Sequence, residues 1–180
     1  MALSIRPYPS QWERHIVLDD HWRIFVRPVK PSDDRLIRDL LAHVNKEDLR
    51  LRFFDSIKEF SPQFIARLTD LDYARAMAFI AIDETSGETL GVVRLHAETV
   101  HESAEYAILL RSDLKGRGLG WSLMQQIIEY AKSEGLKRVR GQILQENTVM
   151  LKMCRELGFE VKTDAQDRGL RDVVLALDNH

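Results

Sequence analysis

The chain has one cysteine, Cys154, among its 180 residues. A single cysteine cannot form an intrachain disulfide, and it excludes a zinc site built from several cysteines. Such sparse use of cysteine is typical of proteins that work in a reducing compartment. We therefore expect a cytoplasmic protein.

Long apolar runs and an excess of charge of one sign are also missing. No stretch approaches the roughly 20 apolar residues that span a bilayer, so no membrane segment is predicted. The formal net charge of −2 gives no sign of the concentrated basic face that a nucleic-acid partner requires. The six histidines lack His-x-x-x-His spacing and clustered carboxylates, so we predict no metal site.

The remaining composition fits one globular domain, since 44% of the residues are hydrophobic. Residues 1–21 carry Pro7 and Pro9 and no sustained periodicity, and we assign them to a lead-in or linker segment. Residues 16–18 are apolar enough to pack on the domain that follows. That domain is expected to cover residues 22–180.

The hydrophobic periodicity of residues 22–180 alternates between strand and helix patterns. Strands are predicted at 22–28, 76–83, 89–98, 104–110, 139–144, 159–163 and 170–177. Helices are predicted from the cap at 32–34 to about 44, from 61 to about 71, from 119 to about 134, and from 147 to 157. The order β-α-α-β-β-β-α-β-α-β-β predicts an α/β fold with a mixed sheet of about seven strands and flanking helices.

Three closely spaced glycines, Gly116, Gly118 and Gly120, precede the helix predicted from residue 119. A P-loop would need Lys and Ser or Thr after the last glycine, and a dinucleotide fingerprint would need a glycine at 121, where the chain has Trp121. What remains is a strand, a glycine-rich turn and a helix start, which suits a pyrophosphate. Lys115 and Arg117 would add mobile positive charge, and the alternative is a merely flexible turn.

The stretch Leu114-Lys-Gly-Arg-Gly-Leu-Gly resembles the acyl-CoA-binding motif of the Gcn5-related N-acetyltransferases (GNAT), with Lys115 in place of the usual first residue. A second segment, from Asn147 to Gly158-Phe159, resembles the Asn…Tyr…Gly-Phe helix of that family. The resemblance implies the family's mostly antiparallel sheet and acetyl-CoA as cosubstrate. The cofactor-binding residues that it implies are Ile108, Leu109, Leu110, Lys115, Gly116, Arg117, Gly118, Leu119, Gly120 and Asn147.

Acyl transfer to an amine needs a base, because a lysine amine titrates near 10.4 and is protonated at neutral pH. On the strand 104–110, Glu105 shares a face with Ala107 and Leu109, and burial there would raise its pKa toward the range of a useful base. The resemblance supports Glu105 as the catalytic base. The alternatives are a solvated Glu105 or one paired with Arg94, and Glu102 is the fallback.

Cys154 stands seven residues after Asn147, where many members of the family carry a tyrosine that acts as general acid. This departure leaves the family's dedicated acid without a counterpart in the sequence. Cys154 has no evident histidine partner and lies on an apolar helix face, so we interpret it as a packed thiol rather than a nucleophile.

A narrower resemblance concerns bacterial protein lysine acetyltransferases of the Pat type, in their C-terminal domain. It is carried by Glu47-Asp-Leu-Arg-Leu-Arg-Phe-Phe and by Leu68-Thr-Asp-Leu-Asp-Tyr-Ala-Arg-Ala-Met-Ala-Phe. It implies a protein lysine substrate, with enzymes such as acetyl-CoA synthetase as candidates, and a place in a larger multidomain protein. Phe53, Phe54 and Tyr73 could border the acceptor groove. Other hypotheses are a small-molecule amine acetyltransferase, a non-catalytic acyl-CoA-binding regulatory module and a pure interaction domain.

Overall fold

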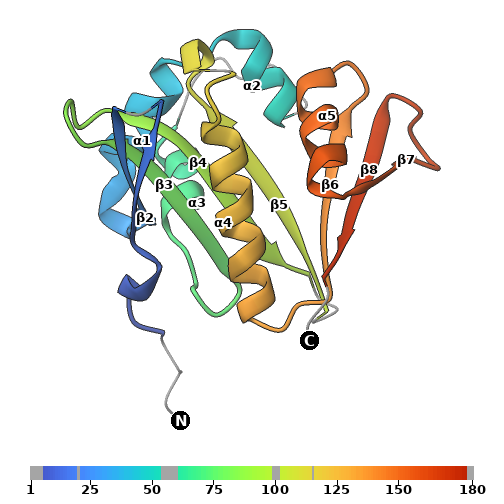
Figure 1. Cartoon of the computed structure of the whole chain (residues 1–180), viewed down its shortest axis with the longest axis horizontal. Helices are drawn as coiled ribbons and strands as arrows, with labels where there is room; N and C mark the ends of the chain where they lie inside the picture. Colours follow the sequence, from blue (N-terminus) through green and yellow to red (C-terminus); the bar gives the residue numbers. More distant parts are fainter. Residues whose placement is uncertain (1–5, 20, 54–60, 99–101, 115, 178–180) are drawn as a thin grey trace.

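The computed structural model describes residues 6–19, 21–53, 61–98, 102–114 and 116–177, which build a sheet with helices on both faces (Figure 1). The sheet has eight strands in the order β1-β2-β3-β4-β5-β6-β8-β7. The strands are β1 (Arg14–Leu18), β2 (Trp22–Pro28), β3 (Ala76–Asp83), β4 (Thr89–Ala97), β5 (Ser103–Leu110), β6 (Arg138–Leu144), β7 (Glu160–Thr163) and β8 (Leu170–Ala176). The helices are α1 (Asp34–Ala42), α2 (Lys46–Phe53), α3 (Pro62–Thr69), α4 (Leu119–Ser133) and α5 (Thr148–Leu157). The α/β class and the mixed, mostly antiparallel sheet are confirmed.

The one parallel contact in the described sheet joins β5 to β6, and it is short. It covers the pairs Ser103–Arg138, Ala104–Val139 and Glu105–Arg140. Every other pairing is antiparallel, as the predicted hairpins require. Beyond Glu105, β5 stays paired with β4, while β6 stays paired with β8. The two strands therefore part in the middle of the sheet.

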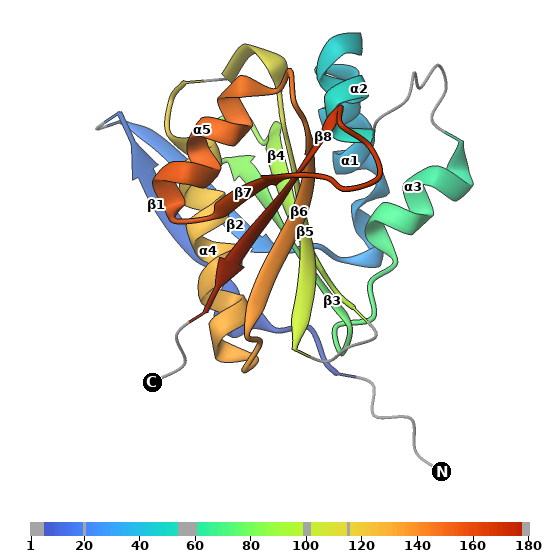
Figure 2. The same ribbon diagram turned by 90° about the vertical axis from the view of Figure 1, so that its right-hand side faces the viewer.

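Helices α4 and α5 cover one face of the sheet, and α1 and α3 cover the other, as Figure 2 shows from the side. In α4 the fully buried Leu123 and Ile127 recur at helical spacing and face the sheet. The alternation of β5 divides its side chains between the two layers. Tyr106 belongs to the core under α4 and α5, and Leu109 belongs to the core under α1 and α3.

Two elements differ from the sequence prediction. Residues 14–18, assigned above to the lead-in segment, form β1 because Ile16 and Leu18 face the core while His15 and Val17 face outward. Residues 46–53 form a third helix before β3. The Asn45 side chain accepts a hydrogen bond from the Asp48 amide at 2.7 Å and caps this helix.

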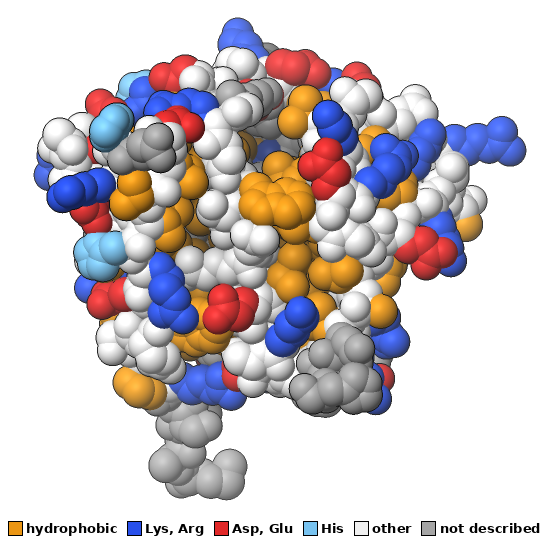
Figure 3. All heavy atoms as spheres, in the orientation of Figure 1, with side chains coloured by type: hydrophobic (Ala, Val, Ile, Leu, Met, Phe, Trp, Pro, Cys, Tyr) orange, Lys and Arg blue, Asp and Glu red, His pale blue; other side chains and the backbone are white. Residues whose placement is uncertain are grey.

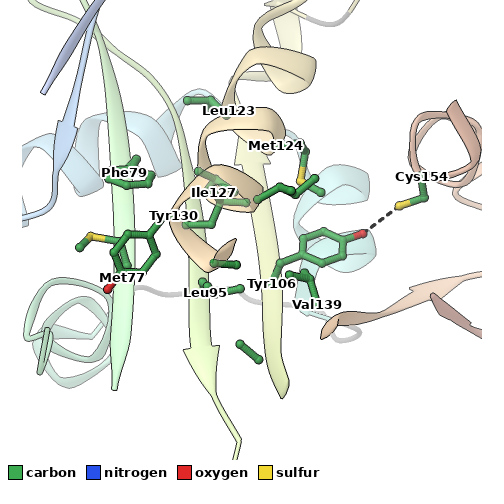
Figure 4. Close-up of a cluster of buried hydrophobic side chains, with 14 of the residues drawn as sticks. Met77, Phe79, Leu95, Tyr106, Leu123, Met124, Ile127, Tyr130, Val139 and Cys154 are labelled. Atoms are coloured by element: carbon green, nitrogen blue, oxygen red, sulfur yellow. Dashed lines mark hydrogen bonds between the residues drawn. The ribbon is translucent and has the colours of Figure 1, made fainter. Parts of the chain in front are cut away.

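The buried Tyr106 lies where β5 and β6 separate (Figure 4). A Cβ at Gly141 of β6 would come within 2.5 Å of its ring, so only glycine fits there. The Tyr106 hydroxyl reaches the Cys154 sulfur of α5 at 3.1 Å. This side chain thus connects β5, β6 and α5 beneath the parting of the strands. None of the described helices is long and apolar enough to span a bilayer.

Candidate functional site

A cavity of about 400 Å³ opens where β5 and β6 part. Its wall is built by β5, by the second half of β6, by α2 and by the start of α5. Figure 3 shows apolar side chains exposed in a band between the surfaces of α4 and α5. The residues of this wall include Arg52, Phe53, Glu105, Ile108, Leu109, Leu110, Asn147 and Met153.

The edge of β5 that faces this cavity has no partner strand from residue 106 onward. Ile108, Leu109 and Leu110, the predicted contacts of a pantetheine arm, all lie in the cavity wall. Backbone amides and carbonyls at such an edge can pair with an extended ligand that carries amide groups of its own. The geometry therefore suits the predicted role of these residues.

The start of α4 lies beside the cavity, and its amides are available. Gly116 and Gly118 have φ values of 81° and 88°, in the left-handed region, and an added Cβ would meet nothing within 4 Å at either residue. Gly118 is the N-cap and supplies no side-chain hydrogen bond. The first-turn amides from Leu119 onward have no acceptor within the helix, and they lie at its positive end. Lys115 lies outside the described residues.

Gly120 has a packing role that the sequence did not reveal. A Cβ there would lie 3.1 Å from the Met153 methyl group and 3.3 Å from Leu110 Cδ1. Both neighbours line the cavity. The missing side chain lets the first turn of α4 approach β5 and α5 closely, which brings the helix start to the cavity.

Arg117 is not the mobile charge that the sequence suggested. Its guanidinium stacks on the Trp22 ring at 3.8 Å from the centroid, and it forms an ion pair with Asp19 at 3.0 Å. These contacts hold the side chain on the β1–β2 hairpin.

Asn147 lies in the cavity wall and also caps α5. Its Oδ1 accepts a hydrogen bond from the Met150 amide at 3.3 Å. The Nδ2 amide makes no hydrogen bond to another described residue, so it keeps two donors for a ligand. One side chain thus serves both the helix and the cavity.

Glu105 lies in the cavity wall, but it is exposed rather than buried. The helices on the α1–α3 face leave this end of β5 uncovered, and the cavity opens beside it. Arg94 does not pair with Glu105, since its guanidinium donates to the carbonyls of Leu68 and Arg67 at 2.6 and 3.2 Å. Glu102 lies outside the cavity wall and forms an ion pair with Lys137 at 3.1 Å.

Arg52 of α2 is a cavity residue that the sequence analysis did not single out. Burial lowers the pKa of its guanidinium to about 10, with a further decrease caused by Arg94 and an opposing effect of Glu105. Its side chain forms no ion pair or hydrogen bond with any described residue, and it lies 4.5 Å from the Phe53 ring centroid. Nothing in the sequence distinguishes Arg52 from Arg50, since both alternate with apolar residues.

Cys154 is a fully buried thiol, as predicted. Burial raises its pKa, and the hydrogen bond with Tyr106 partly offsets that effect. Burial also raises the pKa of Tyr106 well above its ordinary value. A thiol in this state is a poor nucleophile.

Three residues were suggested as the border of an acceptor groove, and the two that the structure describes do not lie together. Phe53 lies in the cavity wall. Tyr73 lies elsewhere, where its hydroxyl donates to the Val29 carbonyl at 2.5 Å. Phe54 lies outside the described residues. Among the side chains that the structure describes, no three His, Cys, Asp or Glu residues gather as they would around a metal ion.

Comparisons with known proteins all identify acetyltransferases as the relatives of this chain. The chain matches the family described as "Acetyltransferase (GNAT) domain" over residues 23–160. The acetyltransferase PA5475 of Pseudomonas aeruginosa is 30% identical over 152 residues, which cover 83% of this chain and 82% of that protein. The acetyltransferase Pat of Mycolicibacterium smegmatis is 28% identical over 159 residues, and the match spans 88% of this chain but only 46% of Pat.

Among solved structures, the crystal structure of the GNAT domain of S. lividans PAT superposes with a TM-score of 0.87. The sequences are 26% identical, and the match covers 95% of this chain and 100% of that domain. The chain is thus similar over nearly its whole length to one complete domain of this kind.

Proposed function

Since the chain belongs to the GNAT family of acetyltransferases and uses acetyl-CoA, we propose that it acetylates the side-chain amines of protein lysines, with Glu105 as the general base. The observation that carries this proposal is one cavity that contains both the unpaired β5 edge and an exposed carboxylate. Similarity to Pat and to the GNAT domain of PAT supports a protein acceptor.

The described residues fit acetyl-CoA in three ways. The open β5 edge at Ile108 to Leu110 would bind the amides of the pantetheine arm. The uncapped start of α4, with the open space at Gly116 and Gly118, would bind the pyrophosphate through main-chain amides. Asn147 would donate its Nδ2 hydrogens from the opposite wall. Acetyl-CoA would supply the activated acetyl group, and these residues would hold it in position.

Glu105 then has a defined task. A lysine ammonium must lose a proton before its nitrogen can attack, and the Glu105 carboxylate would accept that proton, directly or through one water, and pass it to solvent. The carbon–nitrogen bond forms as the carbon–sulfur bond breaks. The nitrogen loses a second proton as it becomes an amide, and the leaving thiolate takes up one proton. These two protons balance. Exposure of Glu105 allows a lysine of a folded protein to reach it.

The substitution Glu105→Gln tests this assignment. It removes the base and keeps the size and hydrogen-bonding capacity of the side chain. We expect kcat to fall by about 10² or more, while the Kd for acetyl-CoA, measured by calorimetry, stays unchanged.

The matched control is Glu102→Gln, which removes an exposed carboxylate next to the same strand but outside the cavity wall. It should leave both kcat and Kd unchanged. An equal loss of acetyl-CoA affinity and turnover in Glu105→Gln would remove Glu105 from the catalytic role.

The acceptor class is tested with labelled acetyl-CoA. The chain is incubated with folded proteins, including acetyl-CoA synthetase, and in parallel with a panel of small amines. Mass spectrometry should locate the label on lysines of a folded protein. Label on small amines alone would favour a small-molecule acetyltransferase, and acetyl-CoA binding without turnover would favour a regulatory module.

A further inference from the structure

The cavity wall contains a cation, Arg52, that forms no ion pair or hydrogen bond with any described residue. Arg52 is half-buried in the cavity wall, and it also lines a smaller cavity that includes Arg94 and Ala107. The two arginines thus lie close together on one face of β5. A buried guanidinium without a partner is unfavourable, since removal of its hydration is not repaid by an ion pair.

Among the described residues, none of the neighbouring charged groups pairs with Arg52. Arg94 is held by the carbonyls of Leu68 and Arg67 near the end of α3, where the helix dipole is negative. Glu105 attracts Arg52 electrostatically, yet the two form neither an ion pair nor a hydrogen bond. The Arg52 guanidinium therefore keeps N–H donors that have no acceptor among the described residues.

The position of Arg52 separates it from the expected phosphate site. Arg52 and Glu105 lie on the side of β5 that faces α1 and α3, where Ala107 and Leu109 also point. The start of α4, which would bind the pyrophosphate, lies on the opposite face. An anion next to Arg52 would consequently come from the molecule whose amine reaches Glu105.

We propose that Arg52 binds a carboxylate of the acceptor, so that the enzyme selects amines that carry a carboxylate close by. The planar guanidinium matches a carboxylate with two parallel hydrogen bonds, which a lysine could not provide. The carboxylate comes either from an aspartate or glutamate near the target lysine or from a free amino acid. This inference rests on the proposed function, because it takes Glu105 to mark where the amine binds.

The test compares acceptors that differ only in their carboxylates. Lysine peptides with flanking Asp or Glu are compared with the same peptides carrying Asn or Gln, and free amino acids are compared with their amides. Wild-type protein should show a kcat/KM about tenfold to hundredfold higher for the carboxylate form. The peptide and amino-acid arms distinguish the two sources.

Arg52→Gln should abolish this preference, and Arg52→Lys should restore only part of it. The matched control is Arg50→Gln, which removes the same charge from a half-buried position on the same helix, outside the cavity wall, where Arg50 pairs with Glu47 and Glu146. It should leave the preference intact. Equal use of both acceptor forms by wild-type protein, or an equal loss for both in Arg52→Gln, would overturn the inference.

A binding measurement keeps the test independent of turnover. Calorimetry with the CoA-saturated protein compares the Kd of acidic and neutral lysine peptides for wild type and Arg52→Gln. If wild type binds acidic peptides more tightly and Arg52→Gln does not, the carboxylate site is supported. This holds even if no lysine is acetylated, because that result would contradict only the proposed function. Equal affinities in wild type would contradict the carboxylate site, whatever the turnover shows.

Discussion

At the scale of single residues, Tyr106 and Cys154 connect the stability of the core to pH. Both side chains are buried, and burial raises the pKa of each above its ordinary value, 10.0 for tyrosine and 9.0 for cysteine. The folded state then keeps both protons at pH values where the unfolded chain releases them. The free energy of unfolding should be at its full value below about pH 9 and should fall as the pH rises further.

The measurement is a series of urea titrations between about pH 7 and pH 10. The double variant Tyr106→Phe/Cys154→Ala should show a shallower alkaline decrease than wild type, although its stability at neutral pH is lower. The difference between the two curves isolates this pair, because the other titrating groups, including Tyr8 and Tyr130, are common to both proteins. Parallel curves would show that the pair does not titrate on unfolding.

The sequence predicted how the side chains of β5 divide between the two faces of the sheet, but not how deeply Glu105 is buried or what Arg117 contacts. The alternation of β5 correctly separated Glu105 and Leu109 from Tyr106, because side chains alternate across a strand. Burial of Glu105 was wrong, since the layer that covers its face ends before this residue, and sequence alone does not show where a neighbouring helix stops. The contact of Arg117 with Trp22 was likewise hidden, because it joins residues far apart in the chain.

At the scale of secondary-structure elements, Asn147 combines two roles that a suitable substitution can separate. Asn147→Ala removes the cap of α5 and the Nδ2 donors, so it should lower the free energy of unfolding by about 1 kcal/mol and also weaken acetyl-CoA binding. Asn147→Ser keeps an oxygen that can cap the helix but has no amide. It should therefore retain stability and still bind acetyl-CoA more weakly.

Urea titration and calorimetry on the same samples provide both quantities. The critical comparison is the affinity of Asn147→Ser for acetyl-CoA. An unchanged Kd in that variant would limit Asn147 to its role at the helix start, and the predicted cofactor contact would be wrong.

The elements themselves were mostly predictable, because their signals are local. The glycine turn followed by apolar residues at helical spacing located α4, and the predicted strands 76–83 and 104–110 match β3 and β5. Helix α2 was missed because its Arg-Leu-Arg-Phe stretch alternates like a strand over four residues. Asn45 could have indicated the start of this helix, because asparagine is one of the residues that commonly cap helices.

At the scale of the whole molecule, the sheet consists of two parts joined by a short seam. The strands β1 to β5 form one continuous part, and β6 to β8 form the other. Three residue pairs connect them, together with the core beneath α4 and α5. The cavity occupies the rest of the boundary, so a ligand bound there would contact both parts at once.

This arrangement predicts where ligand binding slows amide hydrogen exchange. Acetyl-CoA at the open edge should protect amides of β5 between 106 and 110 and the first-turn amides of α4, since both sets would gain hydrogen bonds. Amides in the seam at 103–105 should also slow, because opening of the boundary would require loss of the ligand. At about 100 times Kd, the global stabilisation would be about 2.7 kcal/mol.

The paired β2 and β3 strands, remote from the boundary, supply the internal control. Their exchange should slow only by the global amount, and only where exchange occurs through complete unfolding. If acetyl-CoA protected β2 and β3 as strongly as the β5 edge, or left the start of α4 unprotected, the ligand would not bind across the parting of the sheet. Exchange measured at several acetyl-CoA concentrations by mass spectrometry distinguishes these patterns. Local protection reports on local opening of the structure, whereas global stabilisation reports on complete unfolding.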